Sequence, residues 1–93
     1  MIRTFRNKQT HRLFLSGKRS PFPGDILDRA RRKLMAIDAA INLADLMVPP
    51  SNRLEALKGD RAGAHSIRIN DQWRICFVWH DGDAYDVEVC DYH

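Results

Sequence analysis

The sequence predicts an α+β fold in which two N-terminal helices pack on one face of a small, mainly antiparallel sheet. Apolar residues between Leu27 and Ile41 recur at alternating spacings of three and four, which is typical of one buried helix face. After residue 65, apolar and polar residues alternate in three short runs, which is typical of strands with one apolar face. The chain of 93 residues has the length of one domain, so we predict a single domain over residues 1–93.

Two shorter elements are predicted before the main helix. Residues 2–5, IRTF, suit a short edge strand. Residues 8–16 predict a helix with Leu13 and Phe14 facing inward. Gly17 follows at the place where a left-handed C-cap would end this helix.

The main helix begins after a connector. Residues 18–23, KRSPFP, contain two prolines and predict a segment without regular structure. Asp25 is the predicted N-cap, because its side chain can accept backbone N–H bonds one turn further on. Pro49 and Pro50 end the apolar stretch. The stripe predicted to face the sheet consists of Leu27, Ala30, Leu34, Ile37 and Ile41.

The alternating runs predict three strands, at residues 66–69, 73–79 and 85–90. Residues opposite each other in an antiparallel pair point the same way, so joining the odd-numbered apolar positions into one core needs loops with an odd residue count. Three-residue loops at 70–72 and 81–83 meet this condition. A two-residue turn at 81–82 would flip the last strand and bury Asp86 and Glu88, so it is rejected.

This register gathers basic residues on the other face of the sheet. It sets Arg68 opposite Arg74, and Arg74 opposite Cys90, one diagonal step from Tyr92. Like charges directly opposite each other cost up to about 1 kcal/mol unless an anion compensates. Two anions fit equally well: the carboxylate of Glu88 on the same face, or an RNA phosphate bound in the bidentate geometry that arginine favours.

A basic segment precedes the first of these strands and contains Arg53, Lys58 and Arg61. Such a loop delivers positive charge to the rim of a rigid sheet, and the terminal residues 91–93 are predicted to return to the same rim. Its two glycines lack a Walker pattern, so no nucleotide-binding loop is predicted. We therefore predict an anion site with RNA as the anion, and Arg53, Arg61 and Arg68 as RNA-binding residues.

Charge is segregated along the chain. Residues 1–33 carry ten Lys and Arg against two acids, whereas residues 34–93 carry five against ten. The basic third is compatible with phosphate attraction or with a solvated helix face, and the acidic C-terminal part argues against indiscriminate nucleic-acid binding. No apolar run is as long as a membrane span and the N-terminus lacks an apolar secretion signal, so we expect a cytoplasmic protein that does not contact a membrane.

Cysteine and histidine spacing predicts neither a disulfide nor a metal site. Cys76 and Cys90 fall on one face but offset by two residues, which is too far for unstrained disulfide geometry. The expected compartment is also reducing, so both are predicted to be small buried hydrophobes. The four histidines show no close His/Cys spacing typical of zinc. We expect no metal and no cofactor.

Several motifs together carry a family resemblance: LKGDRAG at 57–63, HSIRIN at 65–70, DQWRICF at 71–77 and the terminal DYH at 91–93. With the opening MIRTF and the AIDAA segment at 36–40, they make the chain resemble the HigB-type toxins of the RelE superfamily, especially the GraT/HigB branch. The resemblance extends over nearly the whole chain. It implies a small RelE-like fold, with helices packed on a small antiparallel sheet.

The resemblance implies the toxin of a type II toxin–antitoxin system, an mRNA interferase that inhibits translation and growth. Such toxins are ribosome-dependent endoribonucleases that work without metal. The RNA 2′-hydroxyl attacks the adjacent phosphate, and a 2′,3′-cyclic phosphate forms as the 5′-hydroxyl leaves. This reaction needs one group to take a proton, one to give a proton, and cations for the charge that develops on the phosphate.

The resemblance also implies site residues. Lys58 and Arg74 match the cationic positions, and the C-terminal catalytic triplet is matched by Asp91, Tyr92 and His93. His93 is expected to be the general acid or base, because its unperturbed pKa lies near neutrality. Tyr92 is expected to stack on or orient a base, and Asp91 to position the neighbouring groups.

Glu55 marks one departure, because some HigB toxins have a histidine at this position. With a raised pKa, Glu55 could transfer a proton. Beside Arg53 and Lys58, however, it would stay ionised and form ion pairs. Slow cleavage is therefore expected.

The resemblance implies partners as well. A small helix-turn-helix antitoxin would bind the toxin, and operator DNA would be contacted only indirectly, through that antitoxin. The ribosome and the mRNA in its A site would be the other partners. The alternative from a different functional class is a non-catalytic RNA- or protein-binding module that retains the RelE-like fold.

Overall fold

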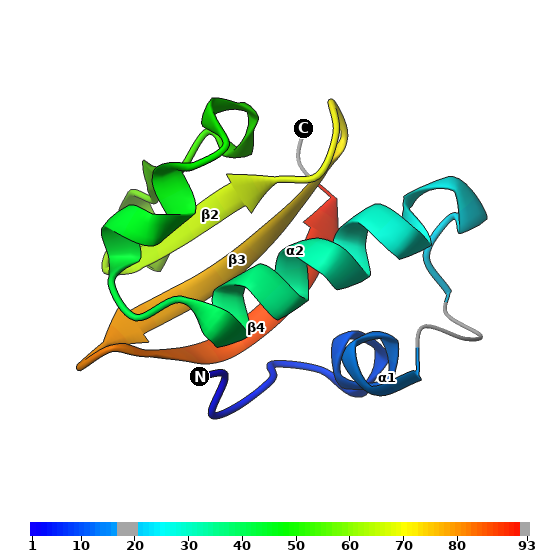
Figure 1. Cartoon of the computed structure of the whole chain (residues 1–93), viewed down its shortest axis with the longest axis horizontal. Helices are drawn as coiled ribbons and strands as arrows, with labels where there is room; N and C mark the ends of the chain where they lie inside the picture. The colour runs from blue at the N-terminus through cyan, green and yellow to red at the C-terminus, as the bar shows by residue number, and fades with distance from the viewer. Residues whose placement is uncertain (17–20, 92–93) are drawn as a thin grey trace.

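The structure, a computed structural model, describes residues 1–16 and 21–91. In these ranges two α-helices cover one face of a four-stranded antiparallel sheet, so the predicted fold class is confirmed (Figure 1). The predictions for Gly17, residues 18–20, Tyr92 and His93 lie outside the described residues. The strand order is β1-β2-β3-β4. The elements are α1 (Lys8–Ser16), α2 (Leu27–Ala39), β1 (Glu55–Ala56), β2 (Ala64–Arg68), β3 (Trp73–His80) and β4 (Asp83–Asp91), with short 3-10 turns η1 (Gly24–Ile26), η2 (Leu43–Met47), η3 (Pro50–Asn52) and η4 (Gly59–Arg61).

Helix α2 packs on the sheet through the predicted stripe, with Ala30, Leu34 and Ile37 fully buried. The prediction for Asp25 is wrong, because Asp25 lies inside the turn η1 and no side chain of the described residues caps α2. The prediction for Ile41 is also wrong, since its side chain is 76% exposed. The helix ends at Ala39 and the next residue is extended, so the chain has left the helix before Ile41 is reached and Ile41 no longer continues the stripe.

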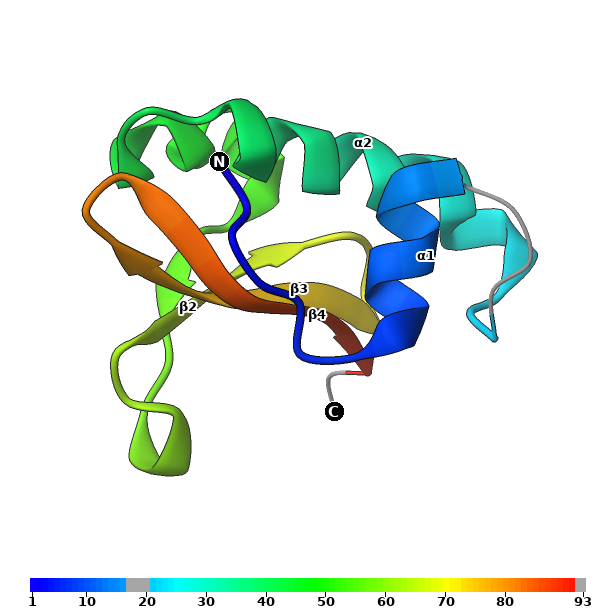
Figure 2. The same cartoon turned by 90° about the horizontal axis from the view of Figure 1, so that it is seen from below.

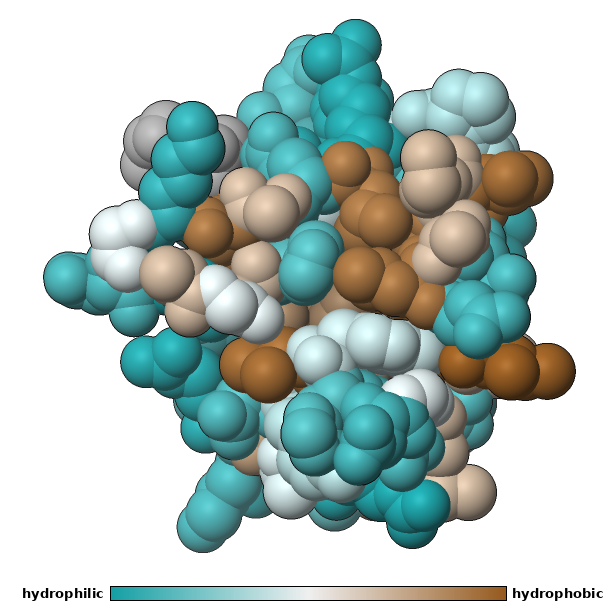
Figure 3. All heavy atoms as spheres, turned by 90° about the vertical axis from the view of Figure 1, so that its left-hand side faces the viewer, coloured by the Kyte–Doolittle hydropathy of each residue, from teal (hydrophilic) through white to brown (hydrophobic). Residues whose placement is uncertain are grey.

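The early end of α2 leaves apolar side chains in solvent. Figure 3 shows apolar residues gathered on the face seen from the left of Figure 1, the side on which the chain leaves α2 for η2. The large exposed hydrophobic residues of this stretch are Ile41, Met47 and Val48. Within residues 1–16 and 21–91, no helix is long and apolar enough to cross a membrane.

The N-terminal segment runs beside β4, as Figure 2 shows. Ile2 bridges Ala84 and Phe5 bridges Val87, both in parallel orientation. The predicted edge position is therefore confirmed, although the segment forms two isolated bridges instead of a continuous strand. In α1, the predicted inward orientation is confirmed, because Leu13 is fully buried and Phe14 packs against the core.

The β2–β3 hairpin has the predicted register. Arg68 pairs with Arg74, and the backbone N–H of Ile69 donates to the carbonyl of Trp73 over 2.9 Å. This leaves residues 70–72 as the predicted three-residue loop. The Asn70 side-chain oxygen accepts the backbone N–H of Trp73 over 2.8 Å, which stabilises the turn locally.

The β3–β4 turn corrects the predicted loop. His80 pairs with Asp83, so only Asp81 and Gly82 form the turn, with φ of 49° and 80°. Positive φ at both central residues is the type I′ pattern, whose twist matches that of the flanking strands. Trp79 consequently pairs with Ala84, not with Tyr85 as predicted.

A β-bulge prevents the burial of acids that the short turn would otherwise cause. Val78 pairs with Tyr85 but Cys76 pairs with Glu88, so two residues of β4 face one residue of β3. Asp86 occupies this bulge with φ of 52° and remains exposed. The extra residue shifts the alternation of β4 by one position, so that the odd-numbered side chains after the bulge again face the core. Tyr85 therefore leaves the predicted apolar row.

Beyond the bulge the register is the predicted one, with Arg74 opposite Cys90. Val87 and Val89 are buried in the core as predicted. The N-terminal segment holds the bulge in place: Thr4 accepts the Asp86 N–H on its hydroxyl over 2.8 Å and the Val87 N–H on its carbonyl over 3.1 Å. The register at the far end of β4 thus depends on residues at the start of the chain.

Phe77 lies at the centre of the apolar layer between sheet and helices and is fully buried, as is Leu34. We expect Phe77→Ala to lower the free energy of unfolding by about 3–5 kcal/mol, because the cavity cannot be filled by its neighbours. Chemical denaturation followed by tryptophan fluorescence measures this loss. Leu15→Ala, at a position 64% exposed on α1, is the control and should change stability little. Equal effects of the two substitutions would contradict the assigned core.

Candidate functional site

Arg74 lies on the face of the sheet that points away from the helices. Its Nε donates to the hydroxyl of Ser66 over 2.8 Å, and its Nη2 donates to the carbonyl of Arg53 over 2.8 Å. The residue is only 6% exposed. Arg74 is therefore buried although it lies on the open face of the sheet, because the loop before β1 folds back over the guanidinium.

The loop reaches Arg74 through an unusual backbone conformation. Arg53 has φ of 45° and ψ of 55°, in the left-handed region, as the residue that ends η3. Its carbonyl oxygen is the group that accepts the Arg74 hydrogen bond, while its own side chain is exposed. Arg53 thus contributes its backbone to the site and leaves its charge in solvent, where it can meet an anion.

Glu55 supplies a carboxylate to the same guanidinium. Its Oε1 lies 3.3 Å from Nη2 of Arg74, and its side chain is 47% exposed. The predicted ion pairing of Glu55 is confirmed, with Arg74 as the partner in place of the sequence neighbours Arg53 and Lys58. A carboxylate in this position holds the fork of Arg74 at a fixed orientation.

The facing arginines are compensated locally. Arg68 pairs with Asp71 in the adjoining loop, and Arg74 pairs with Glu55. The predicted alternative of Glu88 as their counterion is wrong, because Glu88 lies 2.6 Å from Nη1 of Arg61. The sequence could not show the contact between Arg61 and Glu88, because Arg61 lies on the loop between β1 and β2, whereas Glu88 lies on β4 at the other side of the sheet.

Lys58 and Arg61 sit on the loop between β1 and β2. The Leu57 N–H donates to the Ala64 carbonyl over 2.9 Å, which extends the strand pairing to the base of this loop. Arg61 ties the loop to β4 through Glu88. Lys58 is exposed, and its ammonium group has no hydrogen bond or ion pair within residues 1–16 and 21–91. The loop thus presents a cation that no described carboxylate compensates.

Asp91 is the last residue of β4 and lies opposite Trp73. Its carboxylate accepts a hydrogen bond from the Gln72 side-chain amide over 3.1 Å. The β2–β3 loop and the end of β4 are thereby joined at one edge of the sheet. Of the three predicted C-terminal site residues, Asp91 is the one within the described residues.

The two cysteines correct a geometric prediction. The sulfur atoms of Cys76 and Cys90 lie 2.6 Å apart, as free thiols, so their diagonal offset does not separate them. The hydrogen bond between them lowers the pKa of Cys76, because it stabilises a thiolate there, and raises the pKa of Cys90, whose thiol donates it and is also partly buried. Cys76 is buried as predicted, and Cys90 is partly exposed.

Ser66 is a site residue that the sequence reasoning missed. It is fully buried, and its hydroxyl accepts the Nε hydrogen bond of Arg74. The alternation of side chains could have identified it, because in the predicted register Ser66 shares the face of Arg68 and lies one diagonal step from Arg74. A hydroxyl on that face, beside an arginine, is a natural acceptor.

The family of the chain follows from comparison with known proteins. The model of the HigB-like toxins, described as RelE-like toxins of type II toxin–antitoxin systems, matches residues 3–93. The chain belongs to this family. A curated relative from Proteus vulgaris, Endoribonuclease HigB, is 40% identical over 93 residues and the alignment covers all of both chains. Toxin HigB-1 of Vibrio cholerae is 40% identical over 85 residues, 90% of each chain.

Solved structures share the fold of this HigB-like toxin at low identity. The YoeB–YefM complex from Staphylococcus aureus has a chain with a TM-score of 0.62 and 18% identity, covering 100% of this chain and 98% of that one. A mutant of YafQ from E. coli has a TM-score of 0.63 and 9% identity, covering 98% of this chain and 93% of that one. These similarities confirm the RelE-like fold. By its family, the HigB-like toxin is the toxin of a type II toxin–antitoxin system.

Proposed function

We propose that this HigB-like toxin is an endoribonuclease that cleaves mRNA in the ribosomal A site without a metal ion. The observation that carries the proposal is the fixed guanidinium of Arg74, which is held by Ser66, Glu55 and the Arg53 carbonyl. Lys58 supplies a second, exposed cation on the loop between β1 and β2. Full-length identity of 40% to a protein named Endoribonuclease HigB supports the reaction class.

In the proposed reaction, one P–O bond forms and another breaks. The 2′-hydroxyl oxygen attacks the adjacent phosphate as a base removes its proton, and the bond to the 5′-oxygen breaks as an acid protonates it. The products are a 2′,3′-cyclic phosphate and a 5′-hydroxyl. Negative charge accumulates on the non-bridging oxygens during this step, so preorganised cations accelerate it.

The residues of this chain are assigned to that chemistry by residue type and by the resemblance of their motifs to those of the family. Lys58 and Arg74 stabilise the charge on the phosphate, and His93 acts as the general acid or the general base, with water as the partner for the other proton. Tyr92 stacks on or orients a base and Asp91 positions its neighbours. Glu55 is the second candidate for proton transfer, but its ion pair with Arg74 favours a role in holding the guanidinium.

Partners follow from the family and from the proposed substrate. The YoeB–YefM structure is a complex, and we propose that this toxin likewise binds an antitoxin, of the helix-turn-helix type, through which it contacts operator DNA. The ribosome and its mRNA are the other proposed partners, and with these partners we expect the toxin to act in the cytoplasm. The exposed guanidinium of Arg53 and the side chains of Arg61 and Arg68 are the proposed RNA contacts.

Mapping of mRNA ends after induction of the toxin tests the proposal. We expect new 5′-hydroxyl ends within open reading frames, and 2′,3′-cyclic phosphates on the upstream fragments. Ends that carry a 5′-phosphate would contradict the mechanism. Growth inhibition without new ends would favour the non-catalytic module, in which Arg74, with its internal bonds, only braces the loop.

A further inference from the structure

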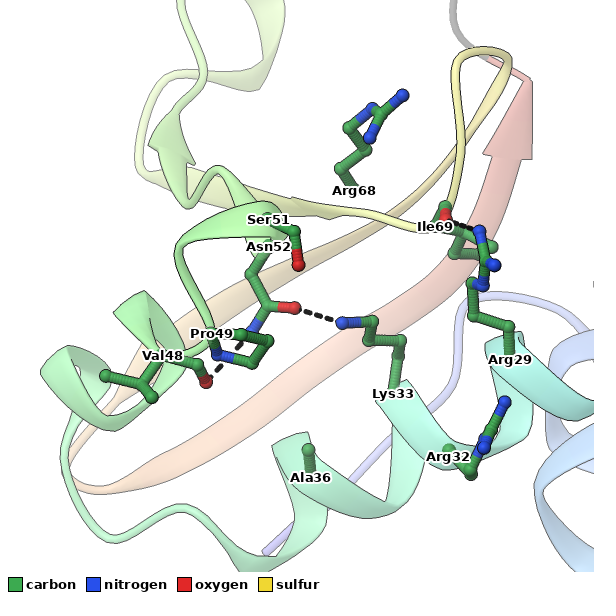
Figure 4. Close-up of a pocket in the computed structure, with 10 residues that line it drawn as sticks. All are labelled: Arg29, Arg32, Lys33, Ala36, Val48, Pro49, Ser51, Asn52, Arg68 and Ile69. Atoms are coloured by element: carbon green, nitrogen blue, oxygen red, sulfur yellow. Dashed lines mark hydrogen bonds between the residues drawn. The ribbon is translucent and has the colours of Figure 1, made fainter.

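A hollow of about 510 Å³ opens between α2, the end of β2 and the η2–η3 segment, and we name it the α2 pocket. Figure 4 shows Arg29 and Lys33 reaching from α2 toward β2 and η3, with Arg32 beside them. Arg68 lines the pocket from β2. Four cationic residues thus line one concavity, although the side chain of Arg68 points away from the other three and pairs with Asp71 (Figure 4). None of the described residues that line it is acidic.

The cations of α2 in this pocket lack counterions. Arg29 donates to the carbonyl of Ile69 over 3.2 Å, and Lys33 donates to the side-chain oxygen of Asn52. In the parts of the chain that the structure describes, Arg32 makes no side-chain hydrogen bond and none of the three pairs with a carboxylate. Burial lowers the pKa of Lys33, and the charges of Arg29 and Arg32 lower it further. The pocket therefore concentrates positive charge that a bound anion would neutralise.

A buried amide fixes the geometry of the pocket. Asn52 is 1% exposed and donates from Nδ2 to the carbonyls of Leu46 and Val48, over 3.1 and 3.3 Å. Its Oδ1 then faces Lys33 and accepts from the ammonium group. Because both polar atoms of the amide are used, the position of Lys33 is set before any ligand arrives, which reduces the entropic cost of binding.

We propose that the α2 pocket binds a backbone phosphate of RNA, at a place separate from Arg74. Arginine forks and an ammonium group suit tetrahedral phosphate oxygens, and the exposed side chain of Val48 beside them offers an apolar wall for a ribose or base. The RNA strand can pass from one site to the other, because Arg68 lines the pocket while its backbone pairs with Arg74. This inference rests on the proposed RNA substrate.

Binding of a single-stranded RNA that carries 2′-O-methyl groups, and so cannot be cleaved, tests the pocket. Arg32→Gln should raise Kd severalfold and reduce the slope of log K against log salt by about 0.7, the loss of one phosphate contact on a single strand. The fold should be unaffected, since the Arg32 side chain makes no hydrogen bond to any described residue. Arg12→Gln removes the same charge from an exposed position on α1 outside the pocket and should leave both quantities unchanged.

Each other outcome overturns the proposal in a recognisable way. Equal losses in Arg12→Gln and Arg32→Gln would mean that only the overall positive charge attracts RNA. Titration with inorganic phosphate, followed by the NMR signals of the Asn52 amide, identifies a site for free phosphate if it responds while RNA affinity does not depend on Arg32. Loss of antitoxin affinity in Arg32→Gln, with RNA affinity intact, would assign the pocket to a protein. If the unaltered toxin neither binds nor cleaves RNA, the proposed function itself is refuted. If the toxin cleaves RNA but the slope of log K against log salt is the same for Arg32→Gln as for the unaltered toxin, only the pocket is refuted.

Discussion

Replacement of Arg74 by lysine is expected to slow RNA cleavage by about 10²–10³-fold, the usual cost of losing one preorganised donor to a developing oxyanion. Lysine keeps the charge but cannot reproduce the planar fork that donates to Ser66 and to the Arg53 carbonyl. The ammonium group would therefore not be fixed by the same contacts. Single-turnover cleavage with excess toxin and programmed ribosomes measures the effect directly.

Arg74→Ala tests whether Arg74 supports the fold as well as catalysis. It leaves the Ser66 hydroxyl and the Arg53 carbonyl without their donor, so we expect the free energy of unfolding to fall by about 1–3 kcal/mol in addition to the loss of cleavage. Arg68→Ala is the matched control, because Arg68 lies directly opposite on β2 but pairs with the exposed Asp71. Its effect on stability should be within about 1 kcal/mol. Full activity in Arg74→Lys would show that the guanidinium acts only as a brace for the loop.

The regular elements of this fold were predictable because they depend on local periodicity. The stripe Ala30, Leu34 and Ile37 and the alternation of β2 and β3 each appear within a few residues of sequence. The end of α2 was not predictable in the same way. Ile41 continues the apolar pattern, but the extended backbone after Ala39 takes the chain out of the helix and leaves Ile41 exposed.

The β3–β4 pairing shows how a wrong turn can accompany a correct register. The predicted three-residue loop and the observed two-residue turn with a bulge at Asp86 both add one residue, so both place Arg74 opposite Cys90. The alternation of side chains fixes how many extra residues the turn and any bulge contain together, but it does not fix where in the hairpin they lie. The bulge is located by Thr4, which lies near the opposite end of the chain, and a contact at that separation leaves no periodic signal in the strand.

The site was predicted in its residue types and missed in its burial. Pairing of Arg68 with Arg74 follows from the hairpin, but the covering of Arg74 depends on the left-handed Arg53 and on where Glu55 lies. These are consequences of a loop that folds back over β2. The α2 pocket was missed for the same reason, because Lys33 and Asn52 meet only after the chain has turned through η2 and η3.

His93→Gln is expected to lower cleavage by about 10²–10⁴-fold, the range attributed to general acid–base catalysis. Glutamine retains a hydrogen-bonding side chain of similar reach but does not titrate, so it removes proton transfer while keeping polar contacts. Thermal unfolding and affinity for the antitoxin should match those of the unaltered toxin. A residue at a chain end is usually dispensable, which makes a large effect at this position informative.

The dependence of the cleavage rate on pH distinguishes a titrating His93 from a merely structural one. The rate of the unaltered toxin should depend on pH, and His93→Gln should lose that dependence over the same pH range. Glu55→Gln is the matched variant, because it removes the competing carboxylate and also releases Arg74 from its ion pair. If His93→Gln cleaves at the unaltered rate and Glu55→Gln loses the pH dependence, the proton is handled by Glu55. If both retain the rate and the pH dependence, proton transfer by either side chain is wrong, and Tyr92 or water must carry it.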